Sequence, residues 1–284
     1  MGRPDDLILS AVAEKGAALM GVLNTTPDSF YDGGRYDQVA AGIARVDALL
    51  EEGADIIDIG GESTRPGAEP VAAAEQLRRI TPALEHAVAR GACVSVDTTL
   101  PEVAAKALAL GAEIVNDVSC LADPELARVA AHAGAPLIVM HSRGPMSNMA
   151  GFSQYPKDGY GDVVVDVLRE WRAARDRALA VGMTEAHVWL DPGLGFAKNA
   201  EQSLTLLTRL SELSHGTPLV VGPSRKSFIA ALDGAPPEER LGGTIAACLA
   251  AVARGASVLR VHDVSAVRQA LGMSRALTPE VARA

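Results

Sequence analysis

The sequence is poor in cysteine and in aromatic side chains. Only three cysteines occur in 284 residues, at Cys93, Cys120 and Cys248, and their spacing pairs none of them. That pattern argues against a disulfide scaffold and against a zinc site, and each thiol is expected to be a small buried apolar group. Aromatic residues make up only 4% of the chain, so there is little ring surface on which a sugar could stack.

The chain also lacks an excess of basic residues and any long apolar run. Its 26 Lys and Arg against 35 Asp and Glu give a net charge of −9, which disfavours binding to nucleic acid or to an anionic membrane. No apolar stretch approaches the roughly 18 residues that span a bilayer. The amino terminus, MGRPDDLILSAVAEKG, lacks the basic start and long apolar core of a signal peptide. We therefore expect a soluble cytoplasmic protein with no nucleic-acid or membrane partner.

What the chain does contain is one pattern repeated eight times. Short, nearly continuous apolar runs alternate with Ala- and Leu-rich segments of helical periodicity. The predicted strands are 18–24, 55–61, 93–98, 113–119, 136–141, 187–193, 218–222 and 257–263. Eight such units predict a single-domain (β/α)8 TIM barrel over residues 1–284, with residues 1–17 as an N-terminal extension. A doubly wound open sheet is the alternative, because one miscounted strand would leave the barrel open.

Polar and charged side chains collect where the predicted strands end. The carboxyl ends of barrel strands meet at one face, and that face carries the catalytic groups of TIM-barrel enzymes. The polar strand-end residues are Asn24, Asp58, Asp97, Asn116, Asp117, His141, Asp191, Ser224, Arg225, Lys226, Arg260 and His262. The segment LNTTPDSFYDGG, residues 23–34, follows the first of these strands and is far longer than a turn requires. We infer that this loop and the strand ends form a functional site.

Three of these strand-end residues, Asp97, Asn116 and Asp191, are hydrogen-bond acceptors expected to share one cavity. Buried carboxylates need partners, so such a cavity favours a ligand rich in N–H donors. A fused nitrogen heterocycle with an amino-pyrimidinone edge suits these acceptors together with Lys226. Any one of them alone could instead cap a following helix, as Asp97 could before TTLPEVAAKAL.

A second group of strand-end residues suits a diphosphate. Arg260 and His262 lie two apart on one predicted strand, so both side chains point the same way and can donate hydrogen bonds to an anion. Asn24 offers a neutral oxygen that can ligate Mg²⁺, the usual companion of a diphosphate. A lone histidine at the position of His262 would more often be structural, and its pairing with Arg260 favours the functional interpretation.

The stretch GPSRKSFIAAL, residues 222–232, predicts a turn that opens a helix. The first backbone N–H groups of such a helix, with Arg225 beside them, would suit a small carboxylate or phosphate. A plain N-cap by Ser224 is the alternative interpretation of the same residues.

Motifs that follow all eight predicted strands together resemble those of the dihydropteroate synthase family. They occur in the order MGVLNTTPDSFYDGG, DIGGESTRPGAEP, SVDT, NDVS, VMHSRG, DPGLGFAKN, GPSRKSF and RVHDV, and the resemblance covers residues 19–270. It implies a (β/α)8 barrel, usually a homodimer, whose small-molecule substrates are 6-hydroxymethyl-7,8-dihydropterin diphosphate and p-aminobenzoate. The implied products are 7,8-dihydropteroate and diphosphate, and the implied cofactor is Mg²⁺.

The resemblance also implies roles for individual residues. The pterin would be held by Asp97, Asn116, Asp191 and Lys226. The diphosphate would be held by Asn24, Arg260 and His262, with Asn24 also binding Mg²⁺. The p-aminobenzoate pocket would be shaped by Thr64, Arg65, Pro66, Phe196 and Ser224. The implied catalytic set is Asn24, Asp32, Arg65, Lys226, Arg260 and His262, with Asp32 facing the carbon that reacts.

Two other functions share part of this pattern. A pterin-binding methyl-transfer module resembles the pterin-holding Asp and Asn motifs, but it is not expected to carry both ESTRPG and SRKSF, which this chain does. A paralogue that binds pterins without turnover is expected to have lost residues of the diphosphate site or the loops. Asn24, Arg65, Lys226, Arg260 and His262 are all present, which favours an active synthase.

Overall fold

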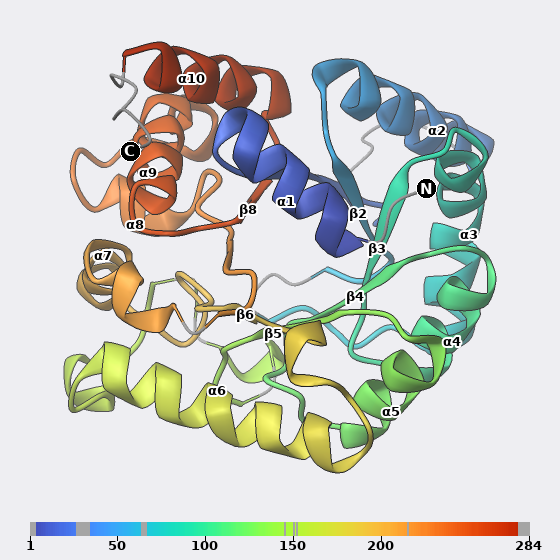
Figure 1. The fold of residues 1–284 in the computed structure, drawn as a ribbon, viewed down its shortest axis with the longest axis horizontal. Helices are drawn as coiled ribbons and strands as arrows, with labels where there is room; N and C mark the ends of the chain where they lie inside the picture. Colours follow the sequence, from blue (N-terminus) through green and yellow to red (C-terminus); the bar gives the residue numbers. More distant parts are fainter. Residues whose placement is uncertain are drawn as a thin grey trace, which may run out of the picture.

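Eight parallel strands form one sheet in the computed structural model, in the order β6-β5-β4-β3-β2-β1-β8-β7. The structure describes residues 4–26, 35–63, 67–144, 146–149, 151, 153–214 and 216–277, with only the backbone for 35–37 and 146. An isolated parallel bridge between Leu190 and Leu219 brings β6 beside β7 and completes the ring (Figure 1). The strands are β1 (Ala18–Asn24), β2 (Ile56–Gly60), β3 (Cys93–Asp97), β4 (Ile114–Asp117), β5 (Leu137–Met140), β6 (Val188–Asp191), β7 (Val220–Val221) and β8 (Val258–Val261).

Helices connect the strands and surround the ring (Figure 1). Each buries one apolar face against the sheet, as in α3, where Ile80, Leu84 and Ala87 are buried. The helices are α1 (Pro4–Lys15), α2 (Arg35–Glu52), α3 (Ala73–Ala89), α4 (Pro101–Ala109), α5 (Pro124–Ala133), α6 (Val163–Ala180), α7 (Ala200–Thr208), α8 (Ser227–Ala230), α9 (Leu241–Val252) and α10 (Val264–Leu277). Short 3-10 turns occupy Met146–Asn148, Lys157–Gly159, Glu185–His187, Leu210–Leu213 and Pro237–Glu239.

The amino end of the barrel is filled and closed by apolar side chains. The inward-facing residues there form one cluster: Ala18, Met20, Ile56, Cys93, Ile114, Ile138, Trp189, Val220 and Val258. Ile8 and Ala11 of α1 belong to the same cluster and are 2% and 4% exposed. In Figure 1 α1 lies across the centre of the ring. The helix therefore covers the end of the barrel opposite the strand-end residues.

The interior becomes polar toward the carboxyl ends of the strands. Side chains alternate along a strand, so every second residue faces the interior. On β2 the inward residues are Ile56, then Asp58, then Gly60, and Asp58 lies opposite Ser95 of β3. Gly60 in turn lies opposite Asp97. The charged side chains thus sit on top of an apolar floor, where water is scarce and electrostatic interactions are strong.

The structure confirms the predicted barrel, and the open-sheet alternative is wrong. All eight predicted strands are present, with β7 reduced to Val220–Val221, between Pro218, which has no N–H to pair, and the turn that begins at Pro223. Residues 4–15 of the predicted extension form α1. Within the described ranges no helix is both long enough and apolar enough to cross a membrane.

Candidate active site

Two glycines at the carboxyl ends of the strands leave room among the polar side chains. A Cβ on Gly60 would lie 3.3 Å from the Cβ of Asp97 and 3.7 Å from Oδ1 of Asn24. A Cβ on Gly222 would lie 3.7 Å from Nζ of Lys226. A side chain at Gly60 would therefore press against Asp97, and one at Gly222 would contact Lys226, so both glycines border side chains that the sequence predicts to bind substrate.

The three predicted acceptors lie together at the ends of β3, β4 and β6. Asp97, Asn116 and Asp191 are 6%, 3% and 4% exposed. Oδ2 of Asp97 accepts from Arg260 at 2.7 Å, and Oδ1 of Asp191 accepts from the backbone N–H two residues further on, also at 2.7 Å. Nδ2 of Asn116 donates to Asp58 at 3.2 Å. Each of the three side chains keeps one oxygen that has no hydrogen bond to a described residue, and these oxygens can accept from a ligand.

Arg260 belongs to this acceptor cluster more than to the predicted pair with His262. Its Nε donates to Oδ2 of Asp58 at 2.6 Å and its Nη2 to Oδ2 of Asp97 at 2.7 Å. Burial and the neighbouring Asp58 charge raise the pKa of Asp97, and Arg260 opposes them. The sequence placed Asp58 among the strand-end residues without a role, although an acid on the inward face of an apolar strand is itself a signal.

Lys226 lies near the acceptor Asp191 and against the ring of Phe196. Its Nζ is 4.6 Å from the ring centroid, within range of a cation–π interaction. Burial lowers the pKa of Lys226 to about 8, opposed by the charge of Asp191. Burial raises the pKa of Asp191, opposed chiefly by Lys226. Phe196 also packs with Val118 and Met140, so it forms an apolar wall beside the charged pair.

His262, Ser224 and Asn24 lie at the rim of the same site. Nδ1 of His262 is 3.0 Å from Oγ of Ser224, and the His262 backbone N–H donates to that oxygen at 3.2 Å. Arg45 donates to the His262 carbonyl at 2.7 Å. Hydrogen bonds therefore fix both the backbone and the ring of His262. Packing around the ring and the charge of Arg260 lower the pKa of His262. The Asn24 side chain is half-buried and makes no hydrogen bond to any other described residue.

Arg225 does not flank an anion site as the sequence suggested. Its Nε and Nη2 donate to the two carboxylate oxygens of Asp263 at 2.8 and 2.7 Å. The residue has a left-handed φ of 54° and its backbone N–H donates to Thr244. The helix that follows, α8, spans only Ser227–Ala230, about one turn. Arg225 is therefore a structural clamp between the β7 and β8 ends.

Four predicted site residues, Asp32, Thr64, Arg65 and Pro66, lie outside the described residues, as does most of the segment 23–34. Their assignments to the reacting carbon and to the p-aminobenzoate pocket stay predictions. The described residues that flank them, Asn24 and Ser63, are at the carboxyl ends of β1 and β2.

Comparison with known proteins gives one consistent answer. The family model of pterin binding enzymes matches residues 20–262. A dihydropteroate synthase of Synechocystis is 45% identical over 93% of this chain and 91% of its own length. The chain belongs to the dihydropteroate synthase family. This family is the one that the eight motifs resemble, and it is favoured over the methyl-transfer module.

Solved structures of the dihydropteroate synthase family agree with the assignment. A structure of the Xanthomonas albilineans enzyme with 4-aminobenzoic acid has a TM-score of 0.85 and 42% identity, covering 92% of this chain and 93% of that one. The same enzyme in complex with 7,8-dihydropteroate has a TM-score of 0.81 and 39% identity over the same shares. Both the barrel and its length therefore match those of known family members.

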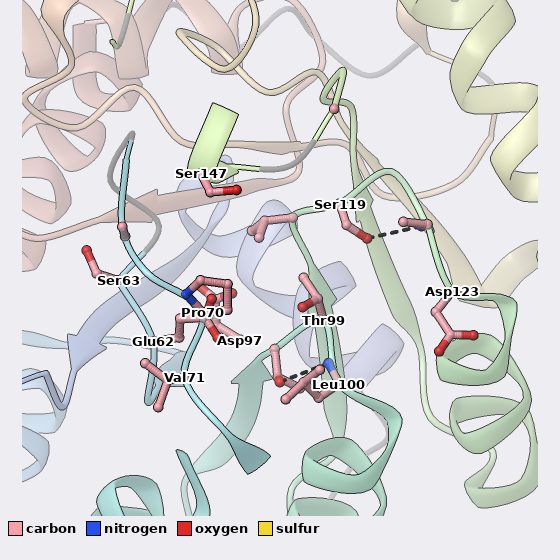
Figure 2. A pocket seen from close by; sticks show the side chains of 15 residues that line it. Glu62, Ser63, Pro70, Val71, Asp97, Thr99, Leu100, Ser119, Asp123 and Ser147 are labelled. Atoms are coloured by element: carbon pink, nitrogen blue, oxygen red, sulfur yellow. Dashed lines mark hydrogen bonds between the residues drawn. The ribbon is translucent and has the colours of Figure 1, made fainter. Parts of the chain in front are cut away.

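In this member of the dihydropteroate synthase family a cavity of about 510 Å³ adjoins one of the three acceptors, Asp97 (Figure 2). It lies between the connections that follow β2, β3, β4 and β5, and Asp97 forms part of its wall. Figure 2 shows Ser63 and Val71 on one side and Ser119 and Asp123 on the other. The described residues that line it include no Lys, Arg or His. Arg260 and His262, the predicted anion ligands, lie elsewhere, on β8 and directly after it.

A buried network behind Phe196 was not found from the sequence. Nζ of Lys198, a fully buried side chain, lies 2.9 Å from Nδ1 of His141 and donates to the carbonyl of Phe196, also at 2.9 Å. Nε2 of His141 is 3.0 Å from Glu170, which also pairs with Arg143. Because Lys198 is the donor at Nδ1, the imidazole is neutral and donates to Glu170 from Nε2. Burial lowers the pKa of Lys198 to about 7 and that of His141 to about 4.

Proposed function

We propose that this chain condenses 6-hydroxymethyl-7,8-dihydropterin diphosphate with p-aminobenzoate to give 7,8-dihydropteroate and diphosphate. The observation that carries the proposal is the acceptor cluster of Asp97, Asn116 and Asp191. Each is nearly fully buried and has an oxygen with no hydrogen bond to a described residue, and the cations Lys226 and Arg260 lie beside the cluster. An amino-pyrimidinone edge with several N–H donors and one carbonyl has the complementary pattern.

The pterin ring would lie between the charged pair and the apolar wall. Asp191 would accept hydrogen bonds from the amino-pyrimidinone edge, and Lys226 would donate to its carbonyl or ring nitrogen. The apolar side chains of Val118, Met140 and Phe196 would contact the ring. A neutral, donor-rich ring would thereby satisfy buried acceptors that otherwise have no partner.

The diphosphate would lie toward the rim, near His262 and Asn24. Nη1 of Arg260 makes no hydrogen bond to a described residue, so it can donate to an anion there. The binding of Mg²⁺ is consistent with the donor set, because Mg²⁺ uses few protein oxygens and keeps its water and phosphate ligands. The Asn24 amide oxygen, which has no hydrogen-bond partner among the described residues, would be that protein ligand. When bound, the ion would neutralise part of the diphosphate charge.

The chain's own groups would act mainly by electrostatic stabilisation. Diphosphate leaves from a CH₂ group on an electron-rich ring, so positive charge develops on that carbon before the aniline attacks. Arg260 and His262 would stabilise the departing negative charge. The predicted role of Asp32 is to stabilise the transient cation. The amine of p-aminobenzoate is neutral, so the site needs no strong general base.

The p-aminobenzoate would bind above the pterin, against Phe196 and Ser224. Phe196 is the apolar wall nearest Lys226, and Ser224 is 8% exposed with its hydroxyl held at His262. Thr64, Arg65 and Pro66 would complete this pocket from the β2 connection. We also propose, from the family resemblance, that the protein is a cytoplasmic homodimer.

The test is to incubate the purified protein with the pterin diphosphate, Mg²⁺ and p-aminobenzoate and to measure diphosphate and dihydropteroate. We expect both products in equal amounts, and neither without the pterin diphosphate. The Asp191→Asn variant presents a donor where an acceptor is needed, so its turnover should fall at least about 100-fold. Asp176→Asn, at a 68% exposed carboxylate on α6, is the matched control and should keep full activity. Binding of the pterin without release of diphosphate would instead identify a catalytically silent pterin-binding protein.

A further inference from the structure

Asp58 is a buried carboxylate that contacts two site residues but not the rim of the site. It is fully buried in the middle of β2, and its Oδ2 accepts from Nε of Arg260 and from Nδ2 of Asn116. Its Oδ1 has no hydrogen-bond partner among the described residues. Gly60, the next inward position on β2, lies opposite Asp97, so Asp58 is one layer deeper than the acceptors.

We propose that Asp58 sets the ligand specificity of the acceptor cluster by fixing the orientation of the Asn116 amide. The inference rests on the proposed function, since the ligand it concerns is the pterin. Asp58 is in this sense a positioning residue, which acts on the ligand through Asn116 and Arg260.

The chemistry of the contact decides the orientation of Asn116. Oδ2 of Asp58 accepts from the guanidinium of Arg260, which can only donate, so the Asn116 amide group that faces this oxygen at 3.2 Å is the NH₂ group. The amide oxygen is then turned away from Asp58. With the free oxygens of Asp97 and Asp191, it completes a set of three acceptors. If the amide turned over, the site would present a donor in the middle of two acceptors.

Arg260 strengthens this arrangement. Its guanidinium bridges Asp58 and Asp97 with hydrogen bonds of 2.6 and 2.7 Å, and a charged donor holds a carboxylate more firmly than a neutral one. Asp58 is therefore held in one position while it accepts from Asn116. A site built to accept from a ligand's N–H groups rejects analogues that carry a carbonyl instead, because buried acceptors would then face each other.

The test compares two diphosphate-free ligands by calorimetry. One is 6-hydroxymethylpterin, and the other is 6-hydroxymethyllumazine, in which a carbonyl replaces the 2-amino donor. We expect the wild-type protein to prefer the pterin on the order of 100-fold. In Asp58→Ala the Asn116 amide can turn over, so the preference should fall at least tenfold, with weaker pterin binding and equal or stronger lumazine binding.

Two variants separate this role from a general structural one. Ser95→Ala is the matched control. Ser95 lies opposite Asp58 in the barrel and is fully buried, and its hydroxyl has no hydrogen-bond partner among the described residues. The Ser95→Ala protein should prefer the pterin over the lumazine as strongly as the wild type does. Asp58→Asn can still place an oxygen where Oδ2 accepts, so it should recover most of the preference. Asp58→Leu keeps the branched shape of the side chain without its hydrogen-bond acceptors, and it replaces Asp58→Ala should the alanine variant not fold.

The possible outcomes are distinct. An unchanged preference in a folded Asp58→Ala or Asp58→Leu protein would overturn the proposal, as would an Asp58→Asn protein no more selective than Asp58→Ala. If Ser95→Ala lost as much of the preference for the pterin as Asp58→Ala does, Asp58 would be no more than a packing residue, and the proposal would also be overturned. Failure of the wild-type protein to bind the pterin at all would overturn the proposed function instead.

Discussion

Lys226 and Asp191 carry opposite charges at the carboxyl end of the barrel, and burial disfavours the charged form of both side chains. It lowers the pKa of Lys226 to about 8 and raises that of Asp191. The ammonium is therefore present below pH 8 and is lost as the pH rises through that value, whereas Asp191 stays ionised on the alkaline side. A ligand that needs the ammonium as a donor must bind more weakly above pH 8.

We predict that the affinity for 6-hydroxymethylpterin falls roughly fivefold between pH 8 and pH 9 in the wild-type protein, because the protonated fraction of a group with a pKa of about 8 falls from about one half to about one tenth. The Lys226→Arg variant stays charged over this range, so its affinity, relative to its own value at pH 7, should fall less. Any titration of the ligand affects both proteins equally and cancels in the comparison. Parallel pH curves for the two proteins would show that Lys226 does not act as the charged donor.

The sequence predicted the site residues whose signal is local and missed those whose partners are distant. Asp97, Asn116 and Asp191 each end an apolar strand, so their place at the mouth follows from the barrel alone. The role of Asp58 depends on Arg260, which is 202 residues further along the chain, and on Asn116, which is 58 residues away. Only closure of the barrel brings these side chains into hydrogen-bonding distance.

At the scale of elements, the connection from β6 to α7 is the most tightly constrained part of the site. Gly193, Gly195 and Ala197 all have left-handed φ values, of 63°, 81° and 46°. A Cβ on Gly193 would lie 2.1 Å from the carbonyl oxygen of His141, so only glycine fits there. Lys198 ties the connection to the end of β5 through His141. Because the backbone of this connection is fixed on both sides of Phe196, it determines where the Phe196 ring lies.

We predict that Lys198→Met destabilises the protein by about 3 kcal/mol, because it leaves buried acceptors without their donor. Displacement of Phe196 should also raise the KM for p-aminobenzoate roughly tenfold or more, and more than the KM for the pterin diphosphate. Urea unfolding and steady-state kinetics measure the two effects. Lys157→Met, at an exposed lysine, is the control and should change neither. Equal increases in both KM values would show that Lys198 does not act through Phe196.

Strands were predictable from the sequence because both of their faces are buried and their apolar runs are nearly continuous. The predicted strand 18–24 is β1 itself. Each of the other predicted strands extends one or two residues beyond the observed strand at one or both ends, where pairing stops. The turn that opens a helix in residues 222–232 was predictable, and the helix itself, α8, is only four residues long. α1 was not predicted as an element of the barrel, because its apolar face is narrow and its partner is the barrel floor.

For the molecule as a whole, the apolar residues that stabilise the fold and the residues of the candidate site lie at opposite ends of the barrel. The amino end is an apolar cluster that α1 completes through Ile8 and Ala11. The carboxyl end holds the buried charges, which cost free energy when they are desolvated. Substitutions at the α1 contact should therefore affect unfolding without affecting the site.

We predict that Ile8→Ala lowers the free energy of unfolding by about 2–4 kcal/mol, as expected for a large-to-small change at a buried position. Leu9→Ala, one residue further along the same helix and 67% exposed, should change it by less than about 0.5 kcal/mol. The kcat/KM of both variants should equal that of the wild type at temperatures where they are folded. A loss of activity in folded Ile8→Ala would show that the two ends of the barrel are coupled.

The closure of the amino end by α1 also has a kinetic consequence. A barrel that is sealed at one end has a single entrance, so every ligand enters and leaves through the same opening. On the proposed function, the pterin lies next to Asp191 and Asn116 and the p-aminobenzoate lies above it, nearer the entrance. The inner substrate must then arrive first, because the outer one blocks its way. An outer ligand that binds before the pterin would obstruct catalysis.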